Sequence, residues 1–162
     1  MIKLLIITFC YFSLSGSVYA QQKESFKFKK LVYHSSRCNG PCPQISLIIE
    51  RNRKVYVRRE LFKTKSQADV RYSGQFSGTL NMKIYNEIIR QLKAAELDSL
   101  KFPDVDCCDG SIKILIVYFN GQRKYFKSMI PPIIVDQLLE KLSGIGLDKR
   151  LKRTSKKELI EE

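Results

Sequence analysis

The sequence predicts an α+β domain, with an antiparallel sheet built from two hairpins and two helices packed on one face of that sheet. Two observations lead to this fold class. Residues 44–58 and 111–128 each contain two extended segments joined by a short turn. Residues 81–95 and 131–145 each place apolar side chains at helical spacing. Because each hairpin buries one face and each helix one stripe, packing both helices on one side is the most economical arrangement.

The two hairpins are marked by alternation and by their turns. Residues 44–50 place isoleucine or leucine at alternate positions, and a charged turn over 51–54 leads into the extended segment 55–58. In the second hairpin, Asn120 and Gly121 separate the two extended segments. Both residues tolerate the positive φ that a two-residue turn requires. Each hairpin is therefore predicted from its own local sequence.

Other extended segments are less clearly marked. Residues 26–33 alternate loosely and are expected to form a first strand, whereas residues 61–78 form either a third strand or a long loop. The sheet face away from the helices is expected to be exposed, and an apolar or aromatic patch there would mark a contact surface. The residues that could contribute to this patch are Tyr56, Leu115, Val117, Phe119 and Phe126.

The two helices have apolar stripes and recognisable start signals. Asn81 is placed to cap the first helix, and Leu80 to pack on Tyr85. Pro131 and Pro132 open the second. The first stripe consists of Tyr85, Ile88, Ile89, Leu92 and Ala95. The second consists of Ile134, Val135, Leu138, Leu139 and Leu142, and Gly144 with Ile145 closes that helix.

Residues 1–20 have the pattern of a cleavable signal peptide. Lys3 precedes an apolar run over residues 4–12, and Ala20 ends a segment suited to cleavage. We therefore expect a periplasmic or secreted protein with no transmembrane segment in its mature chain. Cleavage after Ala20 leaves 142 of the 162 residues, a length that suits one domain over residues 21–147. Residues 148–162 are highly charged and are expected to form a flexible tail.

The mature chain is strongly basic. Lys3 is the only charged residue in the signal peptide, so cleavage changes the net charge from +13 to +12. Such a field favours anionic partners such as an anionic glycan or a lipid headgroup, and another envelope protein is also a possible partner. The alternative is a solvated basic face that keeps the protein soluble. Export argues against a nucleic-acid partner. Four residues are the candidates for anion binding: Lys54, Arg58, Lys124 and Lys127.

Four cysteines remain after cleavage: Cys38, Cys42, Cys107 and Cys108. An even number of cysteines in an exported protein indicates disulfides. Since adjacent cysteines would form a strained ring, two patterns stay open: Cys38 with Cys42, or these two cysteines with Cys107 and Cys108. A cross-link between the two pairs closes the longer loop and would contribute about 4 kcal/mol, more than a five-residue loop does. The cross-link is the pairing that we favour.

The residues do not assemble a recognisable catalytic set or cofactor site, so the leading hypothesis is a non-catalytic binding or structural module of the bacterial cell envelope. The alternative is a copper-binding or thiol-redox protein. His34 precedes Cys38 by four residues, and Cys42 follows after four more, which gives a nitrogen and sulfur ligand set suited to copper or zinc.

Residues 38–43, Cys-Asn-Gly-Pro-Cys-Pro, carry a resemblance to a known family. With the hairpin that follows and Gly74-Gln-Phe-Ser-Gly78 before a helix, they resemble the bacterial domain-of-unknown-function family numbered 6438. Its members share a Cys-x-Gly-x-Cys-Pro opening, a hairpin, a helix and a closing strand pair with a helix. The resemblance covers residues 26–148 and implies an exported domain without an assigned activity. This chain departs from the pattern by adding Cys107 and Cys108.

Overall fold

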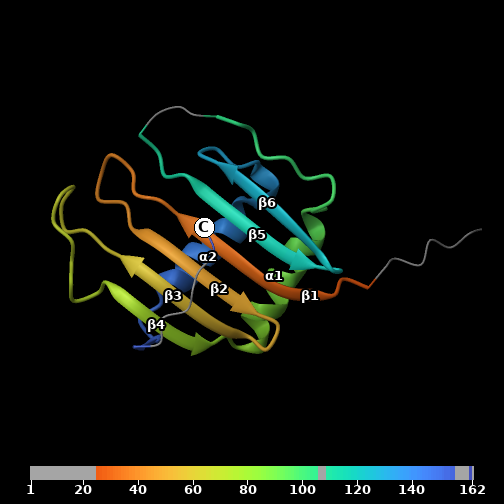
Figure 1. Cartoon of the computed structure of the whole chain (residues 1–162), viewed down its shortest axis with the longest axis horizontal. Coiled ribbons are helices and arrows are strands. Elements are labelled where there is room, and N and C mark those ends of the chain that lie inside the picture. The colour runs from red at the N-terminus through yellow and green to blue at the C-terminus, as the bar shows by residue number, and fades with distance from the viewer. Residues whose placement is uncertain (1–24, 106–108, 156–160, 162) are drawn as a thin grey trace, which may run out of the picture.

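A computed structural model describes residues 25–105, 109–155 and 161. Within these residues the chain forms one seven-stranded antiparallel sheet and two α-helices (Figure 1). In chain order the elements are β1 (Phe28–Ser35), β2 (Gln44–Glu50), β3 (Lys54–Glu60), β4 (Gly74–Thr79), α1 (Met82–Ala94), β5 (Lys113–Phe119), β6 (Gln122–Ser128), the 3₁₀ helix η1 (Ile133–Val135), α2 (Asp136–Gly146) and β7 (Lys152–Arg153). The α+β class and the antiparallel sheet are confirmed.

The strand order is β6-β5-β1-β2-β3-β4-β7. Both predicted hairpins are present, as β2 with β3 and as β5 with β6. A sheet built from these two hairpins is nevertheless the wrong description, because β1 joins them at the centre and β4 and β7 extend one edge. The first strand expected over residues 26–33 is present as β1, and residues 31–35 of this strand are buried on both faces, so its alternation of apolar and polar residues is only loose.

The C-terminal boundary predicted at residue 147 lies too early. Lys152 and Arg153 pair with Ser77 and Phe76 of β4, and Leu151 packs against the main core. A two-residue edge strand with basic side chains has almost no hydrophobic signal, so the sequence could not indicate it. Residues 148–155 therefore belong to the folded domain.

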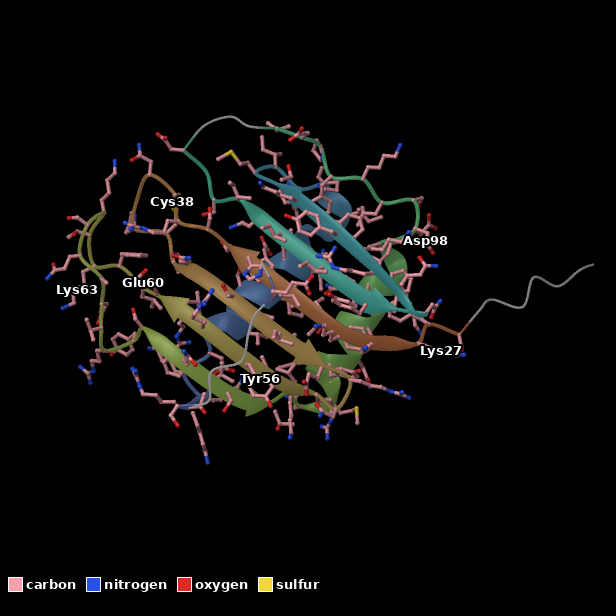
Figure 2. The ribbon with its side chains drawn as sticks, viewed as in Figure 1. Lys27, Cys38, Tyr56, Glu60, Lys63 and Asp98 are labelled. Atoms are coloured by element: carbon pink, nitrogen blue, oxygen red, sulfur yellow. A yellow bond between two sulfur atoms is a disulfide. The ribbon has the colours of Figure 1, made fainter. Side chains whose placement is uncertain are left out.

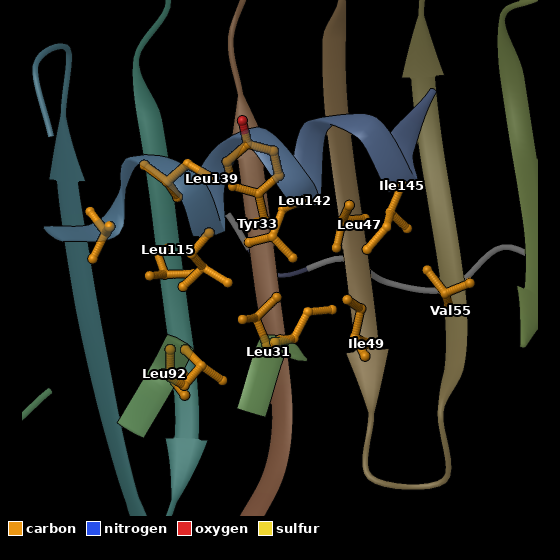
Figure 3. Close-up of a cluster of buried hydrophobic side chains, with 14 of the residues drawn as sticks. Leu31, Tyr33, Leu47, Ile49, Val55, Leu92, Leu115, Leu139, Leu142 and Ile145 are labelled. Atoms are coloured by element: carbon orange, nitrogen blue, oxygen red, sulfur yellow. The ribbon is translucent and has the colours of Figure 1, made fainter. Parts of the chain in front are cut away.

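One sheet face carries the main hydrophobic core, and we call it the core face. Its strand residues include Leu31, Tyr33, Leu47, Ile49, Val55, Leu115 and Val117. The buried helix residues Ile88 and Leu92 of α1 and Leu138 and Leu142 of α2 belong to the same cluster. α2 runs against β2 and β3, and α1 contacts α2. Figure 3 shows Leu139 and Leu142 beside Leu115 and Tyr33, and Ile145 beside Leu47.

The predicted helix cap and hairpin turn are present, whereas the predicted start of the second helix is not. The Asn81 side chain accepts a hydrogen bond from the Ile84 amide at 2.8 Å, so the predicted cap is confirmed. Asn120 and Gly121 have φ of 48° and 77°, as the predicted turn requires. Ile134, which the spacing predicts in the buried stripe of the second helix, is 60% exposed. The helix begins later, and the preceding 3₁₀ turn points only Val135 inward.

The close approach of α2 to β2 gives a matched pair of glycine substitutions. A Cβ at Gly146 would lie 2.5 Å from Ile45 Cγ2, whereas a Cβ at Gly144 would meet nothing within 4 Å. We expect Gly146→Ala to lower the free energy of unfolding by about 1–3 kcal/mol through overpacking. Gly144→Ala should raise it by about 0.5–1 kcal/mol, because alanine favours the helix. Urea unfolding measures both, and equal stabilisation by the two variants would contradict the packing described.

Candidate functional site

The sheet face opposite the core face, which we call the second face, is organised as rows of side chains that cross the strands. Paired residues in an antiparallel sheet point to the same side. The middle row contains Tyr125, Ile116, Val32, Ile48 and Tyr56. A second row contains Lys127, Ile114, His34, Ser46 and Arg58, and a third contains Arg123, Tyr118, Lys30 and Glu50. Figure 2 shows Tyr56 on β3 within this arrangement.

The centre of the second face is buried, which differs from the exposed face that the sequence predicts. Val32 and Ile116 are 0% exposed, and Ile48 is 7% exposed. Ile114 and Tyr118 pack against this small cluster. Of the residues expected in a patch on this face, only Tyr56 lies here. Leu115, Val117, Phe119 and Phe126 belong to the main core, because the strand register places the other set of alternate residues outward.

Three of the four predicted anion-binding residues share the second face. Arg58 pairs with Ser46, Lys127 pairs with Ile114, and Lys54 lies on the same side of β3 as Arg58. Lys124 does not belong with them. It pairs with Val117 on the core side of β6 and forms an ion pair with Asp98 at 2.8 Å. Lys124 therefore points away from the other three.

Glu161 is held on the second face by side chains of three adjacent strands. Arg123 of β6 binds Glu161 Oε1 through Nε at 2.8 Å and through its terminal nitrogen at 2.6 Å. Tyr118 of β5 donates its hydroxyl to Oε2, and Lys30 Nζ of β1 lies 4.0 Å from that oxygen. Both carboxylate oxygens are thus bound. We call Lys30, His34, Tyr118 and Arg123 the carboxylate site.

His34 extends the carboxylate site to the main chain of the bound residue. His34 is 7% exposed, and its Nε2 pairs with the Glu161 backbone carbonyl. Since a carbonyl oxygen only accepts, Nε2 carries the proton. In the neutral ring, Nδ1 then accepts from the Ser46 hydroxyl, whose oxygen lies 2.9 Å away. His34 is therefore a main-chain donor fixed in one orientation.

Most of this site escapes prediction from the sequence. His34 is a candidate there only as a metal ligand, and Lys30, Tyr118, Arg123 and Glu161 are not singled out. The Asn120-Gly121 turn does fix the register of its hairpin, which places Tyr118 opposite Arg123. Alternation along β1 likewise places Lys30 and His34 on one side. The contact with Glu161 has no local sequence signal.

The contact shifts the pKa values of Glu161 and Tyr118 in opposite directions. The hydrogen bond from Tyr118 lowers the pKa of the Glu161 carboxyl, and Arg123 and Lys30 act in the same direction. Conversely, the bond to Glu161 raises the pKa of Tyr118, and burial adds to that effect. The charged and titratable groups that face Glu161 here are Lys30, His34, Tyr118 and Arg123. The contact is thus strongest with Glu161 ionised and Tyr118 protonated.

Acid should release Glu161 from the site. A carboxyl with a lowered pKa stabilises the contact above its ordinary pKa, about 4.3, and loses it as pH falls through the lowered value. We expect the Tyr118 ring signals in an NMR titration to shift with a midpoint below about 4.3. Glu161→Gln should remove this transition. A midpoint at or above the ordinary value, or an unchanged transition in Glu161→Gln, would contradict the arrangement.

The proposed metal ligands do not form a ligand set. Cys38 and Cys42 are joined by a disulfide with their Cα atoms 5.6 Å apart, and both nitrogens of His34 have partners. Across residues 25–105, 109–155 and 161, no group of three or more histidine, cysteine, aspartate or glutamate side chains is placed to hold a metal ion. Figure 2 shows Cys38 in the loop that follows β1.

The cross-link favoured from the sequence is wrong, because Cys38 and Cys42 pair with each other. Cys107 and Cys108 lie outside the described residues. The two cysteine-bearing loops still adjoin, through hydrogen bonds: the Asn39 amide donates to the Asp109 carbonyl at 3.1 Å, and Asn39 Nδ2 donates to the Asp109 carboxylate at 2.9 Å. Ser36 and Ile112 are joined in the same way. These bonds bring the two loops together without a bridge between them.

Comparison with protein-family models gives no match for this chain, and comparison with curated proteins gives none either. The resemblance to family 6438 therefore stays a prediction that rests on residues 38–43. In the part of the chain that the structure describes, no helix has the length and apolar character needed to cross a bilayer.

Proposed function

We propose that this protein is an exported, non-catalytic binding module of the bacterial cell envelope, and that it binds an acidic partner through the second face of its sheet. The carboxylate site carries this proposal. It brings two cations, a phenol and an imidazole from three strands to a single carboxylate-bearing residue. Donors to ionised groups form the strong class of hydrogen bonds. Such a site is suited to binding an anionic group.

The charge around the carboxylate site supports the same conclusion. Lys54, Arg58 and Lys127 share the second face with it, and the mature chain has an expected net charge of +12. Clustered cations raise the rate and affinity of association with an anionic partner, and salt screens this effect. The Cys38–Cys42 disulfide suits the oxidising compartment that the signal peptide predicts.

Charge reversal on the two faces of the sheet tests this function. The probe is a labelled decaglutamate peptide, and the protein is the disulfide-bonded mature chain, which N-terminal sequencing should show to begin at Gln21. We expect Lys54→Glu and Lys127→Glu each to weaken binding about fivefold at low salt, the equivalent of about 1 kcal/mol. Lys124→Glu is the matched control, because Lys124 points to the other side of the sheet, and it should change affinity less than twofold.

Three results would contradict the proposed function. The first is the absence of decaglutamate binding at low salt. The second is an equal effect of all three substitutions, since net charge alone would then explain binding. The third is stronger binding to phosphatidylglycerol vesicles or to an acidic glycan, with the same dependence on the second face, which would assign the face to those ligands instead of an acidic protein.

A further inference from the structure

We propose that the carboxylate site is a receptor for a glutamate-bearing peptide segment of a partner protein, and that Glu161 of the chain's own tail occupies it as an intramolecular competitor. The inference rests on the proposed function and names the ligand class of the same face. It also adds a regulatory consequence, because a partner must displace Glu161 before it binds.

The donors of the site favour a peptide over other anions. Arg123, Tyr118 and Lys30 engage the side-chain carboxylate, while the buried His34 donates to the main-chain carbonyl of the same residue. A peptide glutamate offers both acceptors from one residue. A lipid phosphate or a simple uronic acid has no amide carbonyl to accept the His34 bond. Recognition of both acceptors therefore selects a polypeptide segment.

The site is organised by the sheet and does not depend on its ligand for its shape. Tyr118 is the cross-strand partner of both Lys30 and Arg123. Lys30 Nζ lies 4.5 Å from the centre of the Tyr118 ring, and Arg123 Nε lies 3.3 Å from the Tyr118 hydroxyl. His34 is held by Ser46. None of these contacts involves Glu161, which favours a site preorganised for another carboxylate.

A single chain can supply the competitor. Eight residues lead from Arg153 of β7 to Glu161, and an extended chain of that length spans at most about 26–29 Å. β7 and β1 are separated by four strand spacings, or about 19 Å. Glu161 therefore reaches the site from within its own domain. Such a short tether gives an effective concentration in the millimolar range.

The contact is also accessible to exchange. The side chains of Lys30, Arg123 and Glu161 remain 34%, 43% and 32% exposed. Exposed ion pairs are individually weak. An external peptide can thus replace Glu161 without unfolding of the sheet, and the tether only reduces its apparent affinity.

The test uses the full mature chain and a labelled synthetic peptide with the sequence of residues 155–162, measured by fluorescence anisotropy. We expect Glu161→Gln in the protein to increase peptide affinity about tenfold, because it removes the competitor while keeping the chain length. Adding Arg123→Gln to that variant should abolish the gain. Glu140→Gln is the matched control: Glu140 is exposed on α2 and its replacement removes the same charge, so affinity should stay within twofold of the unmodified chain.

Further measurements distinguish failure of the competitor role from failure of the proposed function. A peptide with glutamine in place of the glutamate at position 161 should bind Glu161→Gln protein at least tenfold more weakly. Decaglutamate binding that depends on Lys54 and Lys127 but is unchanged by Glu161→Gln would overturn the competitor role and leave the proposed function standing. A dimer at micromolar concentration that Glu161→Gln converts to a monomer would also overturn it, since the contact would then join two copies.

Discussion

Replacing Arg59 by leucine is expected to lower the free energy of unfolding by about 3–5 kcal/mol. Arg59 is 5% exposed on the core side of β3. Its Nη1 donates to the carbonyls of Gly146 at 2.8 Å and Asp148 at 3.3 Å, and its Nε donates to the carbonyl of Tyr72 at 3.0 Å. Leucine leaves these acceptors without their donors, and a buried unpaired carbonyl is costly. Urea unfolding monitored by circular dichroism measures the loss.

Arg58 provides the matched control for this variant. It is the next residue along β3, lies on the second face and is exposed. Arg58→Leu should change the free energy of unfolding by less than about 1 kcal/mol. The free energy of unfolding of Arg59→Lys should lie between those of wild type and Arg59→Leu. An ammonium retains part of the hydrogen bonding but lacks the planar guanidinium, whose Cζ lies 4.0 Å from the centre of the Phe76 ring. Equal losses in Arg58→Leu and Arg59→Leu would contradict the role of Arg59 as the link between β3 and the end of α2.

Replacing Ile116 by alanine is expected to cost about 2–5 kcal/mol, the range typical of a core position. Ile116 is 0% exposed although it lies on the second face, where it packs with Val32 and Ile48. Truncation to alanine removes buried apolar atoms and leaves a cavity that the central strands can close only in part. Thermal and urea unfolding both report the change.

The control for Ile116→Ala is the same substitution at a solvent-exposed isoleucine. Ile133 of η1 is 87% exposed, so Ile133→Ala should alter the free energy of unfolding by less than about 0.5 kcal/mol. Similar small effects in Ile116→Ala and Ile133→Ala would mean that the centre of the second face is solvated, as the sequence alone suggests. The buried cluster of Val32, Ile48 and Ile116 beside the carboxylate site would then not exist in solution.

Local signals account for the parts of the fold that could be predicted. Alternation in residues 44–58, the Asn120-Gly121 turn and the Asn81 cap each depend on neighbouring residues. The position of β1 between the hairpins and the edge pairing of β7 depend on contacts between distant segments. The loose alternation of residues 26–33 predicts β1 as a strand, but it carries no information about the place of that strand between the two hairpins. The third strand or long loop expected over residues 61–78 resolves as β4 over its last part.

In the candidate site, too, features set by neighbouring residues can be predicted from the sequence, whereas contacts between distant segments cannot. Alternation around Val55 and Val57 places Lys54 and Arg58 together on the other side of β3. The grouping of Lys54, Arg58, Lys124 and Lys127 fails at Lys124, because a β6 side chain that pairs with Val117 must face the core side. The spacing of His34 to Cys38 suggests only a metal ligand, and the hydrogen bonds that this histidine makes cannot be predicted from it. Its partners, Ser46 and Glu161, lie 12 and 127 residues away, and spacing within one segment carries no information about them.

Chemical-shift mapping determines whether the second face binds a carboxylate-bearing peptide at the site that Glu161 fills. Isotopically labelled Glu161→Gln protein, titrated with the peptide of residues 155–162, should show its largest amide and side-chain shifts at Lys30, His34, Tyr118 and Arg123. Shifts confined to α1, α2 or the Cys38–Cys42 loop, or no saturable shift at millimolar peptide, would show that the carboxylate site is not the binding site.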